Sequence, residues 1–257
     1  MKRAVLSLSG GMDSTALLIR LIADGYQDIR AISFNYGQTH SVELKRAKAN
    51  IKYLETMGVL IEHTIVDLSS FMGLFDSALI GKNKQEIPEG HYAEENMKQT
   101  VVPNRNAIFS ALIYGYALSI ANHTKDNVEI CLGIHAGDHT IYPDTRPEFR
   151  DALEHAFKIG NWDSERVSYY TPYLLSDKTG ILKDTLENCK KLDFSFDTIL
   201  SNTITSYNPD CEGRSSGTSG SDVERIEAFI NIGRKDPIEY QQPWEAVKEN
   251  ALRVLGR

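Results

Sequence analysis

The chain has 257 residues and a formal net charge of −7 at pH 7. This length suits one α/β domain with an appendage, or two small domains. The acidic balance argues against a general nucleic-acid-binding surface, which is normally basic. No run of residues approaches the roughly 18 apolar positions of a membrane span. The cysteines, Cys131, Cys189 and Cys211, are odd in number and far apart. We therefore expect a cytoplasmic protein without disulfides, and with neither a membrane nor a nucleic-acid partner.

Strand-like and helical patterns alternate along the first half of the chain. Strand-like patterns cover residues 3–8, 29–35, 59–67 and 128–134. Helical patterns fill the gaps at about 15–22, 41–57 and 104–122. This alternation predicts an α/β fold with a doubly wound parallel sheet. In such a sheet, ligands bind beyond the carboxyl ends of the strands, where the strand order reverses.

The rest of the chain gives weaker signals of organisation. Residues 69–100 have a mixed composition, which indicates a long insertion or a lid over the expected crevice. Residues 200–222 are rich in Ser, Thr, Gly, Asn and Asp, which suggests a loop before a helix at 222–233. We therefore expect a nucleotide-binding domain over residues 1–200 and a small helical C-terminal appendage over residues 201–257.

Residues 9–15, Ser-Gly-Gly-Met-Asp-Ser-Thr, connect the first predicted strand to the first predicted helix. Two adjacent glycines let the backbone turn its N–H groups toward an anion, and the helix N-terminus adds unpaired donors. The lysine of a Walker loop is absent. The segment instead resembles the pyrophosphate loop of enzymes that cleave ATP between its α and β phosphates and transfer AMP. Asp13 is placed either to contact a phosphate-bound Mg²⁺ or to cap the helix. The predicted ATP-binding residues are Leu8, Ser9, Gly10, Gly11, Met12, Asp13, Ser14 and Thr15, the last two through their hydroxyls.

Four further segments make the resemblance specific. They are Phe34-Asn35-Tyr36-Gly37-Gln38-Thr39-His40-Ser41-Val42-Glu43-Leu44, Val102-Pro103-Asn104-Arg105-Asn106, Tyr142-Pro143-Asp144-Thr145-Arg146-Pro147-Glu148-Phe149, and Thr171-Pro172 with Lys178. Together with the loop they resemble the 7-cyano-7-deazaguanine synthases from residue 3 to about 230. The resemblance implies an adenine nucleotide alpha hydrolase-like fold. It also implies a ligase that uses ATP with Mg²⁺ to adenylate 7-carboxy-7-deazaguanine, admits ammonia to form the amide, and activates the amide with a second ATP to form the nitrile. A homodimer is expected.

The resemblance also suggests which residues bind the substrate. Phe34 and Tyr36 can stack on a purine-like ring, and Gln38 and His40 can donate or accept hydrogen bonds. The alternative is that Phe34 belongs to the strand core and His40 caps the following helix.

Charged residues in the later motifs complete the predicted site. Arg105 can hold a phosphate with two parallel hydrogen bonds, although a cation at a helix start opposes the helix dipole. Lys178 can neutralise charge on phosphate, or it is a solvated helix lysine. We predict Asp13, Arg105 and Lys178 as catalytic. Asp138, Asp144 and Arg146 flank a proline-rich turn and are predicted to bind substrate, with turn chemistry as the alternative.

One departure from the family pattern concerns metal. The family carries four zinc-binding cysteines before its last helix, and the corresponding positions here are Ser206, Ser216, Ser219 and Asp222. Serine hydroxyls do not replace thiolates on Zn²⁺, and one carboxylate cannot hold a structural site alone. We therefore expect no zinc and no other metal site in the protein itself, with Cys211 as a bystander.

The lost cysteines leave the acceptor of the reaction open. Proteins similar to this family but lacking the cysteines are associated with anti-phage gene clusters, where a protein amine can replace ammonia as the acceptor. Transfer RNA thiolation also uses such loops, but it normally needs paired cysteines, which are not evident here. A non-catalytic nucleotide-binding subunit is disfavoured by the intact loop.

Overall fold

The computed structural model describes residues 1–38, 42–77, 80, 101–137, 142–206 and 209–257. Within these residues the chain forms a five-stranded parallel sheet in the order β3-β2-β1-β4-β5. The strands are β1 (Arg3–Ser7), β2 (Asp28–Asn35), β3 (Glu62–Asp67), β4 (Val128–Cys131) and β5 (Val167–Tyr170). The chain builds outward from β1 to β3 and then returns to the other side of β1, so the strand order reverses between β1 and β4. The prediction of a doubly wound parallel sheet is confirmed.

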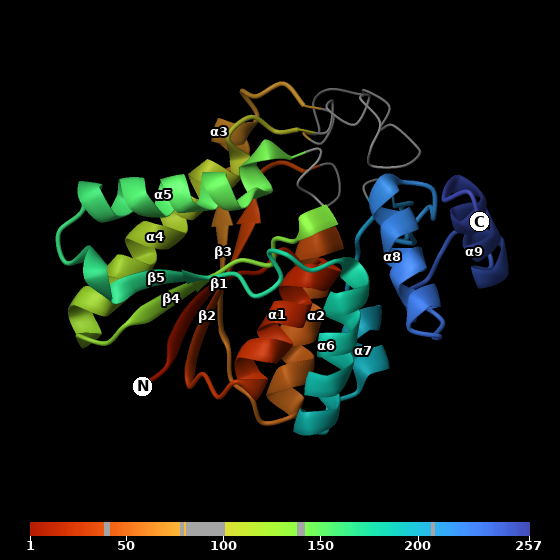
Figure 1. The fold of residues 1–257 in the computed structure, drawn as a ribbon, viewed down its shortest axis with the longest axis horizontal. Coiled ribbons are helices and arrows are strands. Elements are labelled where there is room, and N and C mark those ends of the chain that lie inside the picture. The colour runs from red at the N-terminus through yellow and green to blue at the C-terminus, as the bar shows by residue number, and fades with distance from the viewer. Residues whose placement is uncertain (39–41, 78–79, 81–100, 138–141, 207–208) are drawn as a thin grey trace.

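Helices cover both faces of the sheet (Figure 1). One face carries α1 (Met12–Ala23), α2 (Val42–Thr56), α6 (Lys178–Leu192) and α7 (Phe196–Ser201). The other carries α4 (Arg105–Thr124) and α5 (Pro147–Gly160), and the short α3 (Ser69–Met72) follows β3. Because successive side chains of a strand point to opposite faces, Leu6 belongs to the hydrophobic core under α1 and Val5 to the core under α4. Since both faces of the sheet are covered by helices, odd and even positions of a strand are both apolar, and the strand sequences are nearly continuously hydrophobic.

The C-terminal part consists of α8 (Gly220–Asn231) and α9 (Trp244–Val254). One side of α8 contributes Ala228 and Phe229 to the main core, and its other side packs Val223 and Ile226 against α9. The expected helical appendage is therefore present, with α8 anchored in the core. Its separation as a domain at residue 201 stays a prediction.

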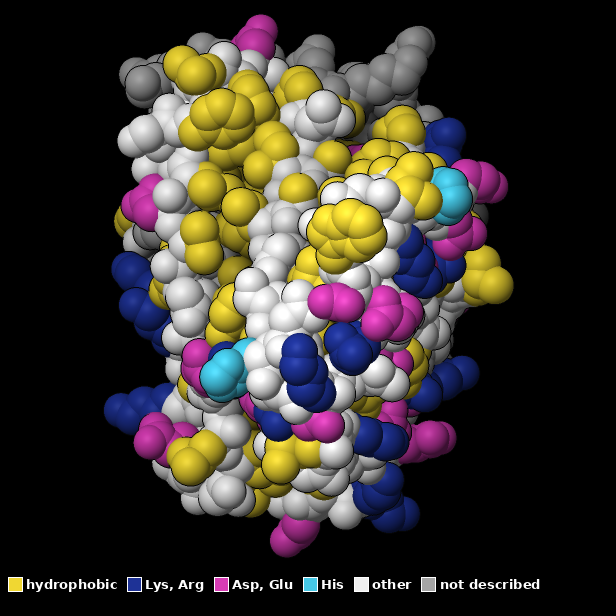
Figure 2. Space-filling model, turned by 90° about the vertical axis from the view of Figure 1, so that its left-hand side faces the viewer, with side chains coloured by type: hydrophobic (Ala, Val, Ile, Leu, Met, Phe, Trp, Pro, Cys, Tyr) yellow, Lys and Arg dark blue, Asp and Glu magenta, His cyan; other side chains and the backbone are white. Residues whose placement is uncertain are grey.

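The surface of one flank and the helices bear on whether the protein binds a membrane. Figure 2 shows the flank that carries the ends of α4 and α5, where hydrophobic side chains gather in the upper part of the view and Lys and Arg are interspersed with Asp and Glu in the lower part. In the described part of the chain, no helix is both long enough and apolar enough to cross a membrane.

Candidate active site

A cavity of about 250 Å³ lies beyond the carboxyl ends of β1, β2 and β4, where the strand order reverses. This is the place at which α/β sheets of this kind bind ligands. Its walls come from the loop after β1, the end of β2, the start of α4, the loop after β4 and the start of α5. The polar, charged and aromatic residues that line it include Ser9, Asp13, Ser14, Phe34, Tyr36, Glu43, Arg105, Phe109, Asp144, Arg150 and Tyr169.

The phosphate loop (residues 9–15) turns from β1 into α1 at one end of this cavity. Gly10 has φ +89°, and a Cβ there would overlap the backbone carbonyl of Glu43, so only glycine fits. Gly11 is the N-cap residue, which leaves the first N–H groups of α1 for a ligand. The Ser9 and Ser14 hydroxyls lie 2.9 Å apart at the mouth of the turn. This arrangement fits a phosphate group.

Two predicted loop residues, Met12 and Thr15, are 0 % exposed and are not among the described residues that line the cavity. Met12 belongs to the core, whereas Leu8 is a core residue that also lines the cavity. The Thr15 hydroxyl, which we expected at the phosphate, is turned inward because helical periodicity places it on the buried face of α1. Asp13 lies in the first turn of α1 without capping it, which removes the helix-cap alternative.

Asp13 belongs to a buried charged cluster with His135, Lys178 and Glu224. The Lys178 ammonium lies 2.8 Å from Nε2 of His135, 3.2 Å from Glu224 and 3.6 Å from Asp13. Lys178 is only 6 % exposed, so the reading of it as a solvated surface lysine is wrong. The Gly137 amide donates to Nδ1 of His135, and a Cβ at Gly137 would crowd that ring. Three separate elements therefore converge on the start of α1.

The charged cluster sets the electrostatics of Asp13. Burial alone would raise the pKa of Asp13, but the Lys178 ammonium, His135 and Arg225 together hold that pKa below its usual value. One carboxylate oxygen of Asp13, Oδ1, is buried without a hydrogen-bond partner in the described structure. An ionised carboxylate with an unused oxygen beside a phosphate-binding turn fits a Mg²⁺ ligand.

Aromatic side chains line the other end of the cavity. Phe34 stacks on Phe109 with ring centroids 4.1 Å apart, and Tyr36 lies 5.6 Å from the same ring. Phe34 therefore belongs both to the strand core and to the cavity wall, which is compatible with stacking on a ligand ring as well as with a core role. The Arg105 guanidinium lies 6.0 Å from the Tyr36 ring centroid. Burial raises the pKa of Glu43 to about 7, although Arg105 and the Gln38 amide oppose this shift.

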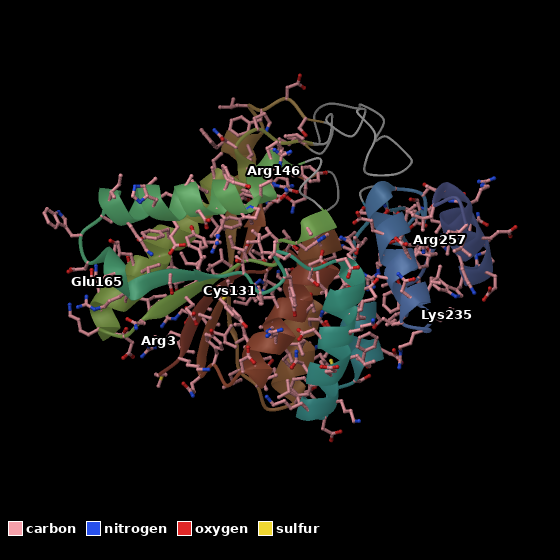
Figure 3. The ribbon with its side chains drawn as sticks, viewed as in Figure 1. Arg3, Cys131, Arg146, Glu165, Lys235 and Arg257 are labelled. Atoms are coloured by element: carbon pink, nitrogen blue, oxygen red, sulfur yellow. The ribbon has the colours of Figure 1, made fainter. Side chains whose placement is uncertain are left out.

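The turn before α5, α5 itself and β5 each supply one buried polar atom without a hydrogen-bond partner in the described part of the chain. Asp144 lines the cavity, and its Oδ1 is buried without a hydrogen-bond partner in the described structure, as are Nε of Arg150 and the Tyr169 hydroxyl. Arg146 is exposed at the start of α5, above the sheet (Figure 3), and is not among the described residues that line the cavity. Its predicted substrate contact is therefore not supported by this structure.

The remaining predicted substrate residues divide into two groups. The Gln38 amide is engaged by its own loop, since it accepts from the Tyr36 backbone N–H and donates to the Phe34 carbonyl. His40 and Asp138 lie outside the described residues. Sequence reasoning did not select Glu43, His135, Arg150 or Glu224. Glu43 stands in a motif segment described above, and His135 directly follows the strand-like pattern at 128–134, whereas nothing local to Arg150 or Glu224 indicates the site.

The positions that carry cysteines in the resembled family form a compact cluster. Oδ2 of Asp222 accepts hydrogen bonds from the hydroxyls of Ser206 (2.8 Å), Ser216 (3.0 Å) and Ser219 (2.9 Å), and from the Gly217 amide (3.1 Å). We call these four side chains the serine–aspartate cluster. Burial raises the pKa of Asp222, while the serine hydroxyls lower it. The loop before α8 is thus held by hydrogen bonds to one carboxylate.

Comparison with known proteins agrees with this architecture. The family model described as "Queuosine biosynthesis protein QueC" matches residues 3–233. The chain is 40% identical over 240 residues to 7-cyano-7-deazaguanine synthase 2 of Colwellia psychrerythraea, covering 93% of this chain and 99% of that protein. It is 43% identical over 239 residues to the 7-cyano-7-deazaguanine synthase of Caldicellulosiruptor saccharolyticus, covering 93% and 96%. The synthase of a Marinomonas species is 42% identical over 241 residues, covering 93% and 99%.

One solved structure is also similar. The NMN synthetase from Francisella tularensis superposes with a TM-score of 0.43 and 15% identity, over 100% of this chain and 84% of that chain, a likeness too slight to support an argument. The family match spans both the phosphate loop and α8, so it covers the whole of the cavity described above. The chain therefore belongs to the QueC family of queuosine biosynthesis proteins.

Proposed function

We propose that this protein is an ATP-dependent ligase that converts 7-carboxy-7-deazaguanine to 7-cyano-7-deazaguanine. The carboxylate is first adenylated, ammonia displaces AMP to give the amide, and a second ATP activates the amide oxygen before the nitrile forms. The names of the relatives support the product. The observation that carries the proposal is a cavity lined both by the phosphate-binding turn and by Asp144, whose Oδ1 is buried without a hydrogen-bond partner among the described residues.

The phosphate-loop end fits the pyrophosphate of ATP. The backbone N–H groups of Gly10 and residues 12–14 and the Ser9 and Ser14 hydroxyls can donate to phosphate oxygens, while the Gly11 N–H donates to the Ser9 hydroxyl oxygen. Lys178, held beside Asp13, and Arg105, across the cavity, can offset the charge that develops as pyrophosphate leaves. Mg²⁺ bound by Asp13 would polarise the phosphate and neutralise part of its charge.

The aromatic end fits a deazaguanine base. Oδ1 of Asp144 can accept hydrogen bonds from the neighbouring N–H groups of a guanine-type edge. Tyr36 and Phe109 offer ring faces next to that carboxylate. Adenylation requires that a base held here direct its 7-substituent toward the phosphate loop.

The serine–aspartate cluster supports a second candidate for the acceptor. If the changed positions mark a branch with a different acceptor, the adenylate is joined to a protein amine instead of ammonia, and no nitrile forms. Adenylation is common to both candidates, and only the nucleophile differs.

Mass spectrometry distinguishes these candidates. The protein is incubated with ATP, 7-carboxy-7-deazaguanine and ammonium, with and without candidate protein partners. Free nitrile and AMP support the ligase, whereas a deazaguanine adduct on a protein with no nitrile supports the second candidate. The matched variant Asp13→Asn should lose AMP release while retaining its fold, and unchanged AMP release would contradict the role of the phosphate loop.

A further inference from the structure

Glu43 is a charged residue that lines the cavity and whose backbone carbonyl lies against the phosphate loop. It stands in the first turn of α2, and its backbone carbonyl abuts Gly10 of the phosphate loop. Its side chain lines the same cavity as Tyr36 and Arg105. The proposed function requires the substrate carboxyl group to meet ATP in this cavity, and Glu43 lines it.

The surroundings of Glu43 leave it able to exchange a proton. The groups that face it are the Arg105 guanidinium from α4, the Tyr36 hydroxyl after β2 and the neutral Gln38 amide. The other charged groups lining the described cavity are Asp13, Asp144 and Arg150. Because burial raises the pKa of Glu43 to about 7, the group is populated in both protonation states near neutral pH. This is the condition under which general acid–base catalysis is most effective.

We propose that Glu43 is the proton acceptor that converts bound ammonium to ammonia for attack on the adenylate. This proposal rests on the proposed function. The Glu43 carboxylate takes one proton from NH₄⁺ and becomes a carboxylic acid. The lone pair of the ammonia nitrogen then forms a bond to the carbonyl carbon, and the C–O bond to AMP breaks with its electron pair leaving on the AMP phosphate. The extra proton on the new amide nitrogen passes to water, and Glu43 returns its own proton to water.

Placement supports this role over a purely structural one. A carboxylate whose only role is to hold Arg105 forms its strongest ion pair when it is fully ionised. Glu43 instead lies in the cavity wall, where burial favours its protonated form. Its negative charge also attracts a small cation such as ammonium to the point where the nucleophile is required.

The test separates deprotonation from adenylation. Glu43→Gln keeps the size of the side chain but cannot accept the proton. Adenylation is measured alone, as ATP–pyrophosphate exchange that depends on 7-carboxy-7-deazaguanine. Amide formation is measured with ammonium and, separately, with hydroxylamine, which is already neutral near pH 7. Glu148→Gln serves as the control, because Glu148 occupies the first turn of α5 and is exposed.

The proposal predicts a specific pattern. Glu43→Gln should retain pyrophosphate exchange, lose about 100-fold or more of the ammonium-dependent rate, and lose much less with hydroxylamine. Glu43→Asp should recover part of the ammonium rate, and Glu148→Gln should match the wild type. Equal losses with both nucleophiles, or a loss of exchange, would overturn the proposal and assign Glu43 to positioning Arg105. Absence of exchange in the wild type would instead overturn the proposed function itself.

Discussion

Removing the Asp222 carboxylate should destabilise the protein strongly. Its side chain is 0 % exposed, and Oδ2 accepts hydrogen bonds from three serine hydroxyls and the Gly217 amide. Asp222→Ala leaves these donors without their acceptor. An unsatisfied buried donor costs about 1–3 kcal/mol. The hydroxyls can rotate toward one another, as Ser219 and Ser221 already do at 3.0 Å, so we count two lost donors and expect about 4 kcal/mol.

Asp222→Asn is the matched control. The Asn side chain keeps the accepting oxygen and the shape, but its amide nitrogen takes the place of Oδ1, which is buried without a hydrogen-bond partner in the described structure, so Asp222→Asn should cost about 1–3 kcal/mol, less than Asp222→Ala. Urea unfolding is followed by tryptophan fluorescence and circular dichroism, and coincidence of the two unfolding curves checks two-state behaviour.

Elemental analysis of the wild type should find no stoichiometric zinc, and a chelator should leave its Tm unchanged. Equal stability of Asp222→Ala and wild type, or one tightly bound zinc per chain, would refute the reasoning.

Three further predictions concern the cluster, substrate binding and pH. Replacing all four side chains of the serine–aspartate cluster by cysteine should create a site that binds one Zn²⁺ per chain, measured by elemental analysis and by zinc-dependent Tm; no binding would show that the four positions do not converge as described. Asp144→Asn should weaken binding of 7-carboxy-7-deazaguanine by roughly 1–3 kcal/mol and leave ATP affinity nearly unchanged in calorimetry, and loss of ATP affinity alone would place this turn at the nucleotide. Because the pKa of Glu43 rises from 4.5 to about 7 on folding, the native state holds a proton that the unfolded chain has released, so the free energy of unfolding should fall by up to about 3 kcal/mol as pH rises through this window and stay level above it. Urea titrations at pH 5 and pH 8 should show a smaller fall in Glu43→Gln, and an identical fall would contradict the assignment.

The features predicted from the sequence are those set by neighbouring residues. The phosphate loop is one, because a glycine pair between an apolar strand and a helix defines its own geometry. The first helix begins at Met12, earlier than the expected residue 15, since Gly11 caps it directly. The strand β5 and the helices α5 and α6 were not predicted. The α5 sequence is strongly amphipathic, so this helix could have been predicted, whereas β5 is only four residues long and carries little periodic signal.

The parts of the site that sequence could not give depend on long-range contacts. His135 and Lys178 are 43 positions apart, and Glu224 comes from α8 beyond the expected domain boundary. No local pattern marks Glu224 as different from other helix-surface acids, since only the packing of α8 against α6 brings it to Lys178. Asp13 likewise belongs to a charged cluster that the sequence does not indicate. Arg146 is the opposite case. It was predicted as a substrate residue because it lies in a matching motif, but in the structure it is exposed at the start of α5.

The central claim is that the carboxylate is activated by transfer of AMP, and an isotope measurement tests it most directly. The substrate 7-carboxy-7-deazaguanine is prepared with both carboxylate oxygens as ¹⁸O and converted with excess ATP and ammonium. The account predicts that one ¹⁸O appears in each of two AMP molecules for every nitrile formed, because each activated oxygen leaves on an AMP phosphate. Label found in inorganic phosphate or released to water, with unlabelled AMP, would contradict it.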